Sequence, residues 1–154
     1  MESQLNYSNL GEVEVSYKYK SSLNQRPKLS SPNEVFDFAK YLFHEERLGL
    51  QEQFIVIYLN KSNRVIGSCN LFTGSISACV VDMKLILAIG LKLMANGVIL
   101  LHNHPSGNIQ PSQQDLSLTT KIKNALELLD MTLIDHLIVS PDQRFTAFTQ
   151  EGYL

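Results

Sequence analysis

Residues 98–107 read VILLHNHPSG, so that four consecutive apolar residues run directly into two histidines that stand two positions apart. An apolar run without alternation is typical of a strand that is covered on both faces of a sheet. In extended chain His102 and His104 point to the same side, and Pro105 keeps His104 away from helical angles. Because ligands of open α/β sheets bind outside the carboxyl ends of the strands, this position suits a functional site.

A carboxylate joins the two histidines from a predicted helix over residues 113–129. The apolar stripe of that helix has three- and four-residue spacing: Leu118, Ile122, Ala125 and Leu129. Asp115 extends this stripe by one step of three, and a carboxylate that faces inward needs a partner because an unpaired buried charge is costly. Two histidines and a carboxylate, with a position open for water, are typical of catalytic zinc sites. The alternative is that Ser112-x-x-Asp115 is only a helix capping box and that the histidines bond backbone groups at a strand end.

The remaining chain predicts an α/β domain with a central sheet and helices on its faces. Ser31-Pro-Asn-Glu34 predicts a capped helix whose apolar positions continue to Leu42, with Gly49 where the chain leaves it. Residues 83–95 are apolar on most sides, which predicts a heavily buried helix or a self-association surface in a homo-oligomer. Strands are expected over 54–59, 65–72, 98–101, 132–139 and 144–148, with turns at 61–64 and 73–75 and a short run ending at 80–81.

Composition excludes several classes of protein. The chain has 154 residues, 44% of them hydrophobic, and a net charge of −2, which predicts one folded domain without a global field that attracts nucleic acid or anionic lipid. Cys69 and Cys79 are expected to be buried and reduced rather than paired in a disulfide. Lys84, Lys92 and the Asn96-Gly97 pair interrupt the longest apolar segment, so we expect no membrane span, and the absence of a signal-peptide pattern predicts a cytoplasmic protein.

The first residues are the most polar part of the chain. We interpret residues 1–27 as an N-terminal arm with a half-buried strand over 14–19, and residues 28–154 as the folded domain. Four basic residues without an acidic one lie between Lys18 and Lys28, and they are expected to be solvated rather than to form a polyanion-binding face.

The spacing His-x-His, seven residues, Ser, two residues, Asp resembles the signature of the JAB/MPN metalloproteases, also called JAMM proteins, at His102, His104, Ser112 and Asp115. The local sequence HNHPSG followed by PSQQD is similar to that of the RadC branch. Asp135-His136-Leu-Ile-Val139 likewise resembles the strand that closes RadC domains. The resemblance covers roughly residues 28–150.

The resemblance implies a cytidine-deaminase-like α/β fold, with a central mixed sheet flanked by helices, built around one Zn²⁺ ion. His102, His104 and Asp115 would be the protein ligands of the zinc, Glu52 the acid/base and Ser112 the group that steadies the oxyanion. It implies zinc-dependent hydrolysis of a peptide or isopeptide bond, with a peptide or protein as substrate.

Two departures from the family pattern keep a second hypothesis open. The family tends to have an arginine where this chain has Met83-Lys84, and nothing before residue 30 resembles the helix-hairpin-helix segment usual in RadC proteins. The alternative is an accessory protein of DNA repair or recombination that keeps the metal site with little catalysis. A zinc nucleobase deaminase is excluded because the chain lacks a Pro-Cys-x-x-Cys segment.

Other residues near the motif receive structural roles or remain ambiguous. From the residues alone, Glu52 cannot be preferred over Glu45 or Glu46, and only the resemblance selects it. His136 is expected to make structural hydrogen bonds, and His44 to be exposed. Gly107 is expected to give the loop backbone freedom, and Asn103 either to orient the loop or to contact substrate.

Overall fold

The computed structural model describes residues 20–74 and 81–154. The predicted strand over residues 14–19 and the run ending at residue 80 lie outside these residues. The helices and strands, with η for 3₁₀-helices, are η2 Leu23–Gln25, α1 Pro32–Ala39, η3 Glu45–Arg47, β1 Glu52–Leu59, β2 Val65–Gly74, α2 Met83–Leu93, β3 Gly97–Asn103, α3 Gln113–Glu127, β4 Thr132–Val139, β5 Phe145–Ala147 and α4 Phe148–Glu151.

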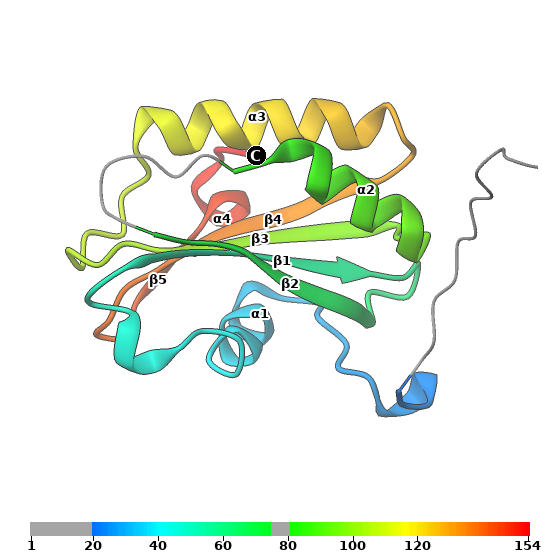
Figure 1. The fold of residues 1–154 in the computed structure, drawn as a ribbon, viewed down its shortest axis with the longest axis horizontal. Helices are drawn as coiled ribbons and strands as arrows, with labels where there is room; N and C mark the ends of the chain where they lie inside the picture. Colours follow the sequence, from blue (N-terminus) through cyan, green and yellow to red (C-terminus); the bar gives the residue numbers. More distant parts are fainter. Residues whose placement is uncertain (1–19, 75–80) are drawn as a thin grey trace, which may run out of the picture.

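A five-stranded mixed sheet forms the centre of the molecule, as predicted. Among the described residues the strand order is β2-β1-β3-β4-β5, and β3–β4 is the parallel pair, whereas the other pairs are antiparallel. A parallel pair needs a crossover connection, and helix α3 provides it. Helix α1 covers one face of the sheet, whereas α2, α3 and α4 lie on the other (Figure 1).

Strand β3 occupies the middle of the sheet and is buried along its whole length. Its alternate residues enter two different hydrophobic cores: Leu101 packs with the α1 side and Leu100 with the α2–α3 side. The side-chain alternation of a strand therefore directs His102 and His104 toward the α2–α3 side. The prediction of a central strand that ends at the histidines is confirmed.

Helix α1 begins as predicted but ends earlier. The Ser31 hydroxyl accepts a hydrogen bond from the Glu34 N–H at 3.3 Å, while the Glu34 carboxylate accepts one from the Ser30 N–H at 2.6 Å. The helix ends at Ala39, because the following residues turn more tightly through bonds that span three residues and lead to η3. The prediction that Gly49 marks the end of this helix is wrong.

Two strand boundaries differ from the prediction. Thr73 and Gly74 continue β2 instead of forming a turn, because their backbones pair with Gln53 and Glu52 at the start of β1. Strand β5 ends at Ala147, and Phe148 begins the short helix α4. The predicted turn over residues 61–64 is present, with Asn63 at a φ of 57°.

Helix α2 is much less buried than its sequence predicts. Only Ile86 and Gly90 are buried, whereas Leu91 is 48% exposed and Met94, which ends the helix in a left-handed conformation, is 81% exposed. Met83, Leu87, Ile89 and Leu93 pack against the core but are only partly buried, and the exposed apolar residues lie on the outer side of the helix. The interpretation as a heavily buried helix is wrong.

Cys69 is less buried than the sequence predicts. Cys69 is a free thiol, but it is half-exposed on strand β2 rather than buried. Its neighbours on the sheet lie on one side only, because β2 is an edge strand. Cys79 lies outside the described residues.

None of the helices in the described parts of the chain has the length and hydropathy of a membrane-spanning segment.

Candidate metal centre

His102, His104 and Asp115 meet at one point, where strand β3 ends and helix α3 begins. The two Nε2 atoms are 2.9 Å apart. The Asp115 carboxylate places Oδ1 at 3.3 Å from Nε2 of His102 and Oδ2 at 3.5 Å from Nε2 of His104. One ligand atom from each of the three residues lies within 4.8 Å of the others. The structure therefore brings together the three residues that the sequence predicts as metal ligands.

These distances and donor types fit a zinc ion. Ligand atoms about 2.0–2.1 Å from a tetrahedral zinc ion lie about 3.3–3.4 Å from one another. The separations of 2.9, 3.3 and 3.5 Å scatter around that value. Imidazole nitrogen and carboxylate oxygen are ligands that zinc accepts, and three protein ligands leave a fourth position open.

Asp115 also closes the capping box of helix α3, as the alternative interpretation of Ser112-x-x-Asp115 predicts. The Ser112 N–H and hydroxyl donate to Asp115 Oδ2 at 2.7 and 2.6 Å, and the Asp115 N–H donates to the Ser112 hydroxyl at 3.1 Å. Oδ1 makes none of these bonds and faces His102. The cap thus fixes the carboxylate in the orientation that presents it to the histidines.

The charged groups of the cluster shift one another's pKa values. Burial alone would raise the pKa of Asp115, but the neighbouring side chains of His102, His104 and Ser112 hold that pKa well below its usual range. The hydrogen bond to Asp115 raises the pKa of His104, and Glu52 adds a smaller effect in the same direction.

The loop after β3 fixes the ring of His104. Nδ1 of His104 lies 2.6 Å from the Asn108 carbonyl oxygen, and because a carbonyl can only accept, Nδ1 must donate. The other ring nitrogen, Nε2, faces Asp115 and His102. Gly107 has a φ of 80°, which confirms the predicted need for backbone freedom. Arg144 donates to the Gly107 carbonyl at 3.1 Å and ties this loop to the β4–β5 turn.

Asn103 orients the loop, which is one of its two predicted roles, from a fully buried position. Its Nδ2 donates to the carbonyls of Leu48 and Gln51 at 2.7 and 2.9 Å, and its Oδ1 accepts from the Gln53 N–H at 2.7 Å. This amide lies between the two histidines in the sequence and fastens the end of β3 to the segment that leads into β1.

Glu52, the predicted acid/base, begins strand β1 on the same face of the sheet. Phe54 pairs with His102 across the β1–β3 ladder, and the two rings stack with centroids 6.0 Å apart. Glu52 precedes Phe54 by two residues and therefore points to the same side, toward the end of β3 that carries His104. Glu52 is half-exposed, and its negative charge contributes to the raised pKa of His104.

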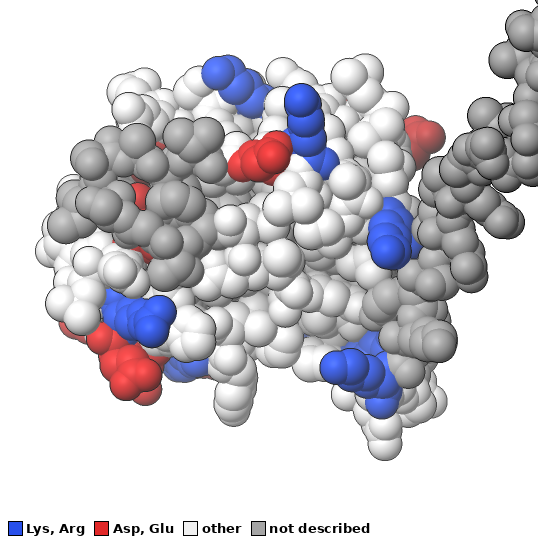
Figure 2. All heavy atoms as spheres, in the orientation of Figure 1, with Lys and Arg blue, Asp and Glu red and all other residues white. Residues whose placement is uncertain are grey.

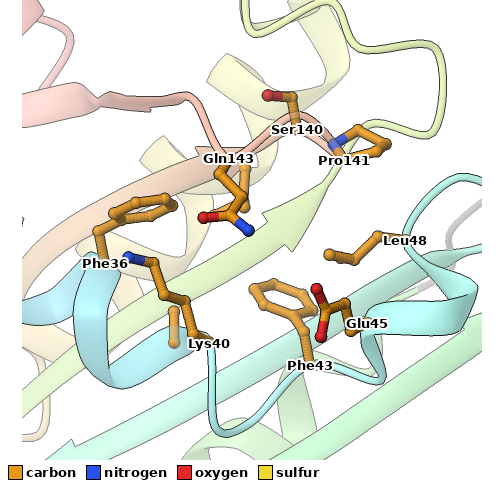
Figure 3. Close-up of a pocket in the computed structure, with 10 residues that line it drawn as sticks. Phe36, Lys40, Phe43, Glu45, Leu48, Ser140, Pro141 and Gln143 are labelled. Atoms are coloured by element: carbon orange, nitrogen blue, oxygen red, sulfur yellow. The ribbon is translucent and has the colours of Figure 1, made fainter.

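Glu45 lies on the opposite side of the sheet. It lines a pocket between α1, η3 and the β4–β5 turn, together with Phe43, Leu48 and Val139 (Figure 3). Leu48 and Val139 belong to the core on the α1 side, whereas the histidines face the α2–α3 side. The structure thus distinguishes Glu52, on the histidine side of the sheet, from Glu45, whereas the sequence pattern alone does not.

His136 contacts His102 directly, and Thr119 contacts His136. Nε2 of His136 lies 2.8 Å from Nδ1 of His102, and Nδ1 of His136 lies 2.6 Å from the Thr119 hydroxyl. The sequence predicts a hydrogen-bonding role for His136, but it does not single out Thr119. A usable signal exists, since Thr119 follows Asp115 by four residues and so lies one turn along the same side of α3. Burial keeps the pKa of His136 well below its usual value.

Figure 2 shows how charged side chains are distributed on one face of the molecule. On the face shown in Figure 2, the described Lys and Arg side chains are distributed among uncharged surface rather than gathered in one basic patch. His44, predicted to be exposed, is exposed at the start of η3.

Comparison with known proteins identifies the relatives of this chain. Similar proteins, each named UPF0758 protein, occur in Flavobacterium johnsoniae (40% identity over 125 residues), Aquifex aeolicus (39% over 142) and Staphylococcus aureus (35% over 130). The matches cover 81%, 92% and 84% of this chain but only 53%, 59% and 55% of the respective relatives. The chain thus spans little more than half their length. The model of the RadC-like JAB domain matches residues 29–153, and the chain belongs to this family.

Proposed function

We propose that this protein is a zinc-dependent hydrolase of the JAMM type that cleaves a peptide or isopeptide bond. The observation that carries the proposal is the convergence of His102, His104 and Asp115 at distances that suit a tetrahedral ion. Bound zinc supplies a nucleophile at neutral pH, because it lowers the pKa of water from 15.7 to about 7.

Glu52 and Ser112 complete the proposed chemistry. The Glu52 carboxylate accepts a proton from the attacking water and delivers it to the leaving amine, a role commonly worth about 10²–10⁴-fold in rate. Its half-exposed position on the histidine side of β1 leaves it accessible to water and substrate. The Ser112 hydroxyl is exposed at the start of α3, beside the carboxylate of Asp115. In the proposed reaction it donates to the oxygen that becomes negative in the tetrahedral intermediate.

Peptide hydrolysis by matched glutamate variants tests this proposal. Zinc-loaded wild type, Glu52→Gln and Glu45→Gln would be incubated with a peptide library, and the products identified by mass spectrometry. We expect cleavage by wild type and Glu45→Gln, and a rate about 10²–10⁴-fold lower for Glu52→Gln. Glu52→Gln should still retain zinc, because Glu52 is not one of the three ligands.

The same experiment addresses the binding-protein alternative. Equal, background-level cleavage by all three proteins would contradict the proposal of a hydrolase. It would favour an accessory protein that keeps the metal site without efficient chemistry. If wild type is active, Glu52→Gln is the variant with which to trap a bound peptide and so identify the substrate.

A further inference from the structure

A chain of three hydrogen bonds runs from helix α3 to the back of the His102 ring. It begins at the Asp115 carbonyl oxygen, which lies 2.6 Å from the Thr119 hydroxyl. It continues from that hydroxyl to Nδ1 of His136 at 2.6 Å, and from Nε2 of His136 to Nδ1 of His102 at 2.8 Å. His102 then points its remaining nitrogen, Nε2, at the metal centre.

The first bond fixes the direction of all the others. A carbonyl oxygen has no proton, so the Thr119 hydroxyl must donate to Asp115 and can only accept from His136. Nδ1 of His136 therefore carries the proton. A neutral imidazole has one donor and one acceptor, so Nε2 of His136 must accept, and Nδ1 of His102 must donate to it. Nε2 of His102 therefore carries a lone pair instead of a proton, and it lies 2.9 Å from Nε2 of His104 and 3.3 Å from Oδ1 of Asp115.

Burial makes this arrangement hard to replace by another. His136 is completely buried, and Thr119 and His102 are 2% and 5% exposed. Aromatic rings pack beside His136: Phe148 at 4.5 Å and Phe54 at 5.9 Å between centroids. Rotating the His136 ring by half a turn would set carbon atoms against the Thr119 hydroxyl and against His102, and both of those polar groups would lose a buried partner.

We propose that Thr119 and His136 are positioning residues that hold His102 in the Nδ1–H tautomer, so that Nε2 is presented to the metal as a ligand. This inference rests on the proposed metal centre. Asp115 then acts twice, because its carboxylate faces the ion and its backbone carbonyl begins the chain of bonds that orients the opposite ligand. Hydrogen-bonding partners behind a ligand histidine fix its ring and its tautomer, and their loss commonly costs about 10–100-fold in metal affinity.

The tautomers can be read directly in the metal-free protein. Long-range ¹H–¹⁵N correlation spectra of ¹⁵N-labelled wild type, recorded above the ordinary titration range of histidine, show which ring nitrogen carries the proton. We expect Nδ1–H for both His102 and His136. A proton on Nε2 of His102 would overturn the proposal whether or not the protein binds zinc, which separates it from the fate of the proposed function.

Three threonine variants test the role of the hydroxyl. Thr119→Val removes the group that accepts from His136, and we expect zinc affinity to fall about 10–100-fold and an Nε2–H population to appear at His102. Thr119→Ser keeps the hydroxyl and should restore both readouts. Thr120→Val is the matched control, since Thr120 is exposed on the same helix and its hydroxyl donates to the Leu116 carbonyl at 3.0 Å.

We expect weaker zinc binding and a changed His102 tautomer in Thr119→Val, and neither change in Thr119→Ser or Thr120→Val. Unchanged zinc affinity and an unchanged His102 tautomer in a folded Thr119→Val protein would refute the positioning role. If this variant does not fold, the wild-type spectrum and Thr119→Ser still decide the matter, because the proposal requires Nδ1–H at His102 in both.

Discussion

Replacing Asn103 with leucine should destabilise the fold by several kcal/mol. The side chain is fully buried and satisfies two carbonyl oxygens and one N–H, at distances of 2.7, 2.9 and 2.7 Å. Leucine branches at the same atom but can neither donate nor accept. A buried polar group that loses its partner costs about 1–3 kcal/mol, so three such groups would cost about 3–9 kcal/mol. Because Gln51 is only half-buried and its carbonyl can gain water, we expect about 3–6 kcal/mol.

Denaturant unfolding of the metal-free proteins, followed by circular dichroism, measures this cost. Asn103→Leu should lower the midpoint while leaving the slope unchanged, since the surface exposed on unfolding stays the same. The matched control is Asn124→Leu on the exposed side of α3, which should stay within about 0.5 kcal/mol of wild type. A free energy of unfolding for Asn103→Leu within about 1 kcal/mol of wild type would refute the idea that this amide fastens the site to the segment before β1.

Two further substitutions test other features of the fold. Tyr58→Phe removes the buried hydroxyl that donates to the Ile86 carbonyl at 3.0 Å, and should cost about 0.5–1.5 kcal/mol of unfolding free energy near neutral pH. Burial raises the pKa of Tyr58 above its usual 10.0, so the stability that the neutral phenol provides is complete below pH 10 and is lost as the pH rises further. The difference between wild type and Tyr58→Phe should therefore shrink above pH 10 in unfolding experiments, and a constant difference would argue against a buried neutral phenol. Gly107→Ala should cost about 1–2 kcal/mol, because φ is 80° and a Cβ would meet no atom within 4 Å, so only the backbone conformation is penalised. Gly49→Ala, where the added Cβ would lie 3.9 Å from Pro141, is its control, and equal stability of the two variants would contradict this explanation.

The sequence was sufficient to predict the cluster of His102, His104 and Asp115, because the place of each residue follows from a local pattern. An unbroken apolar run predicts the central strand, and residues two apart in a strand share a side, which pairs His102 with His104. Helical spacing then places Asp115 on the inner side of α3. The selection of Glu52 needed the resemblance to a family, because β1 and β3 are adjacent only in the folded sheet.

Other features depend on contacts between distant segments. His136 lies 34 residues from His102, and the two rings meet only because β3 and β4 pair in a parallel register that the separate segments do not reveal. Thr119 resembles an ordinary helix residue until its neighbour across the core is known. Helix α2 misled the prediction because its hydrophobicity extends around the helix, and periodicity then cannot say which residues the core will use.

Zinc binding by the purified, metal-stripped chain tests the central claim most directly. Wild type, Asp115→Asn and Asp130→Asn would be compared by calorimetric titration with zinc. Both substitutions remove one negative charge, the first at a proposed ligand and the second at an exposed position, where asparagine tolerates the φ of 55°. We predict one zinc ion per chain for wild type and for Asp130→Asn, and binding that is lost or at least about 10-fold weaker for Asp115→Asn. The absence of stoichiometric zinc binding by wild type, or equal affinity in all three proteins, would contradict the assignment of His102, His104 and Asp115 as a metal centre.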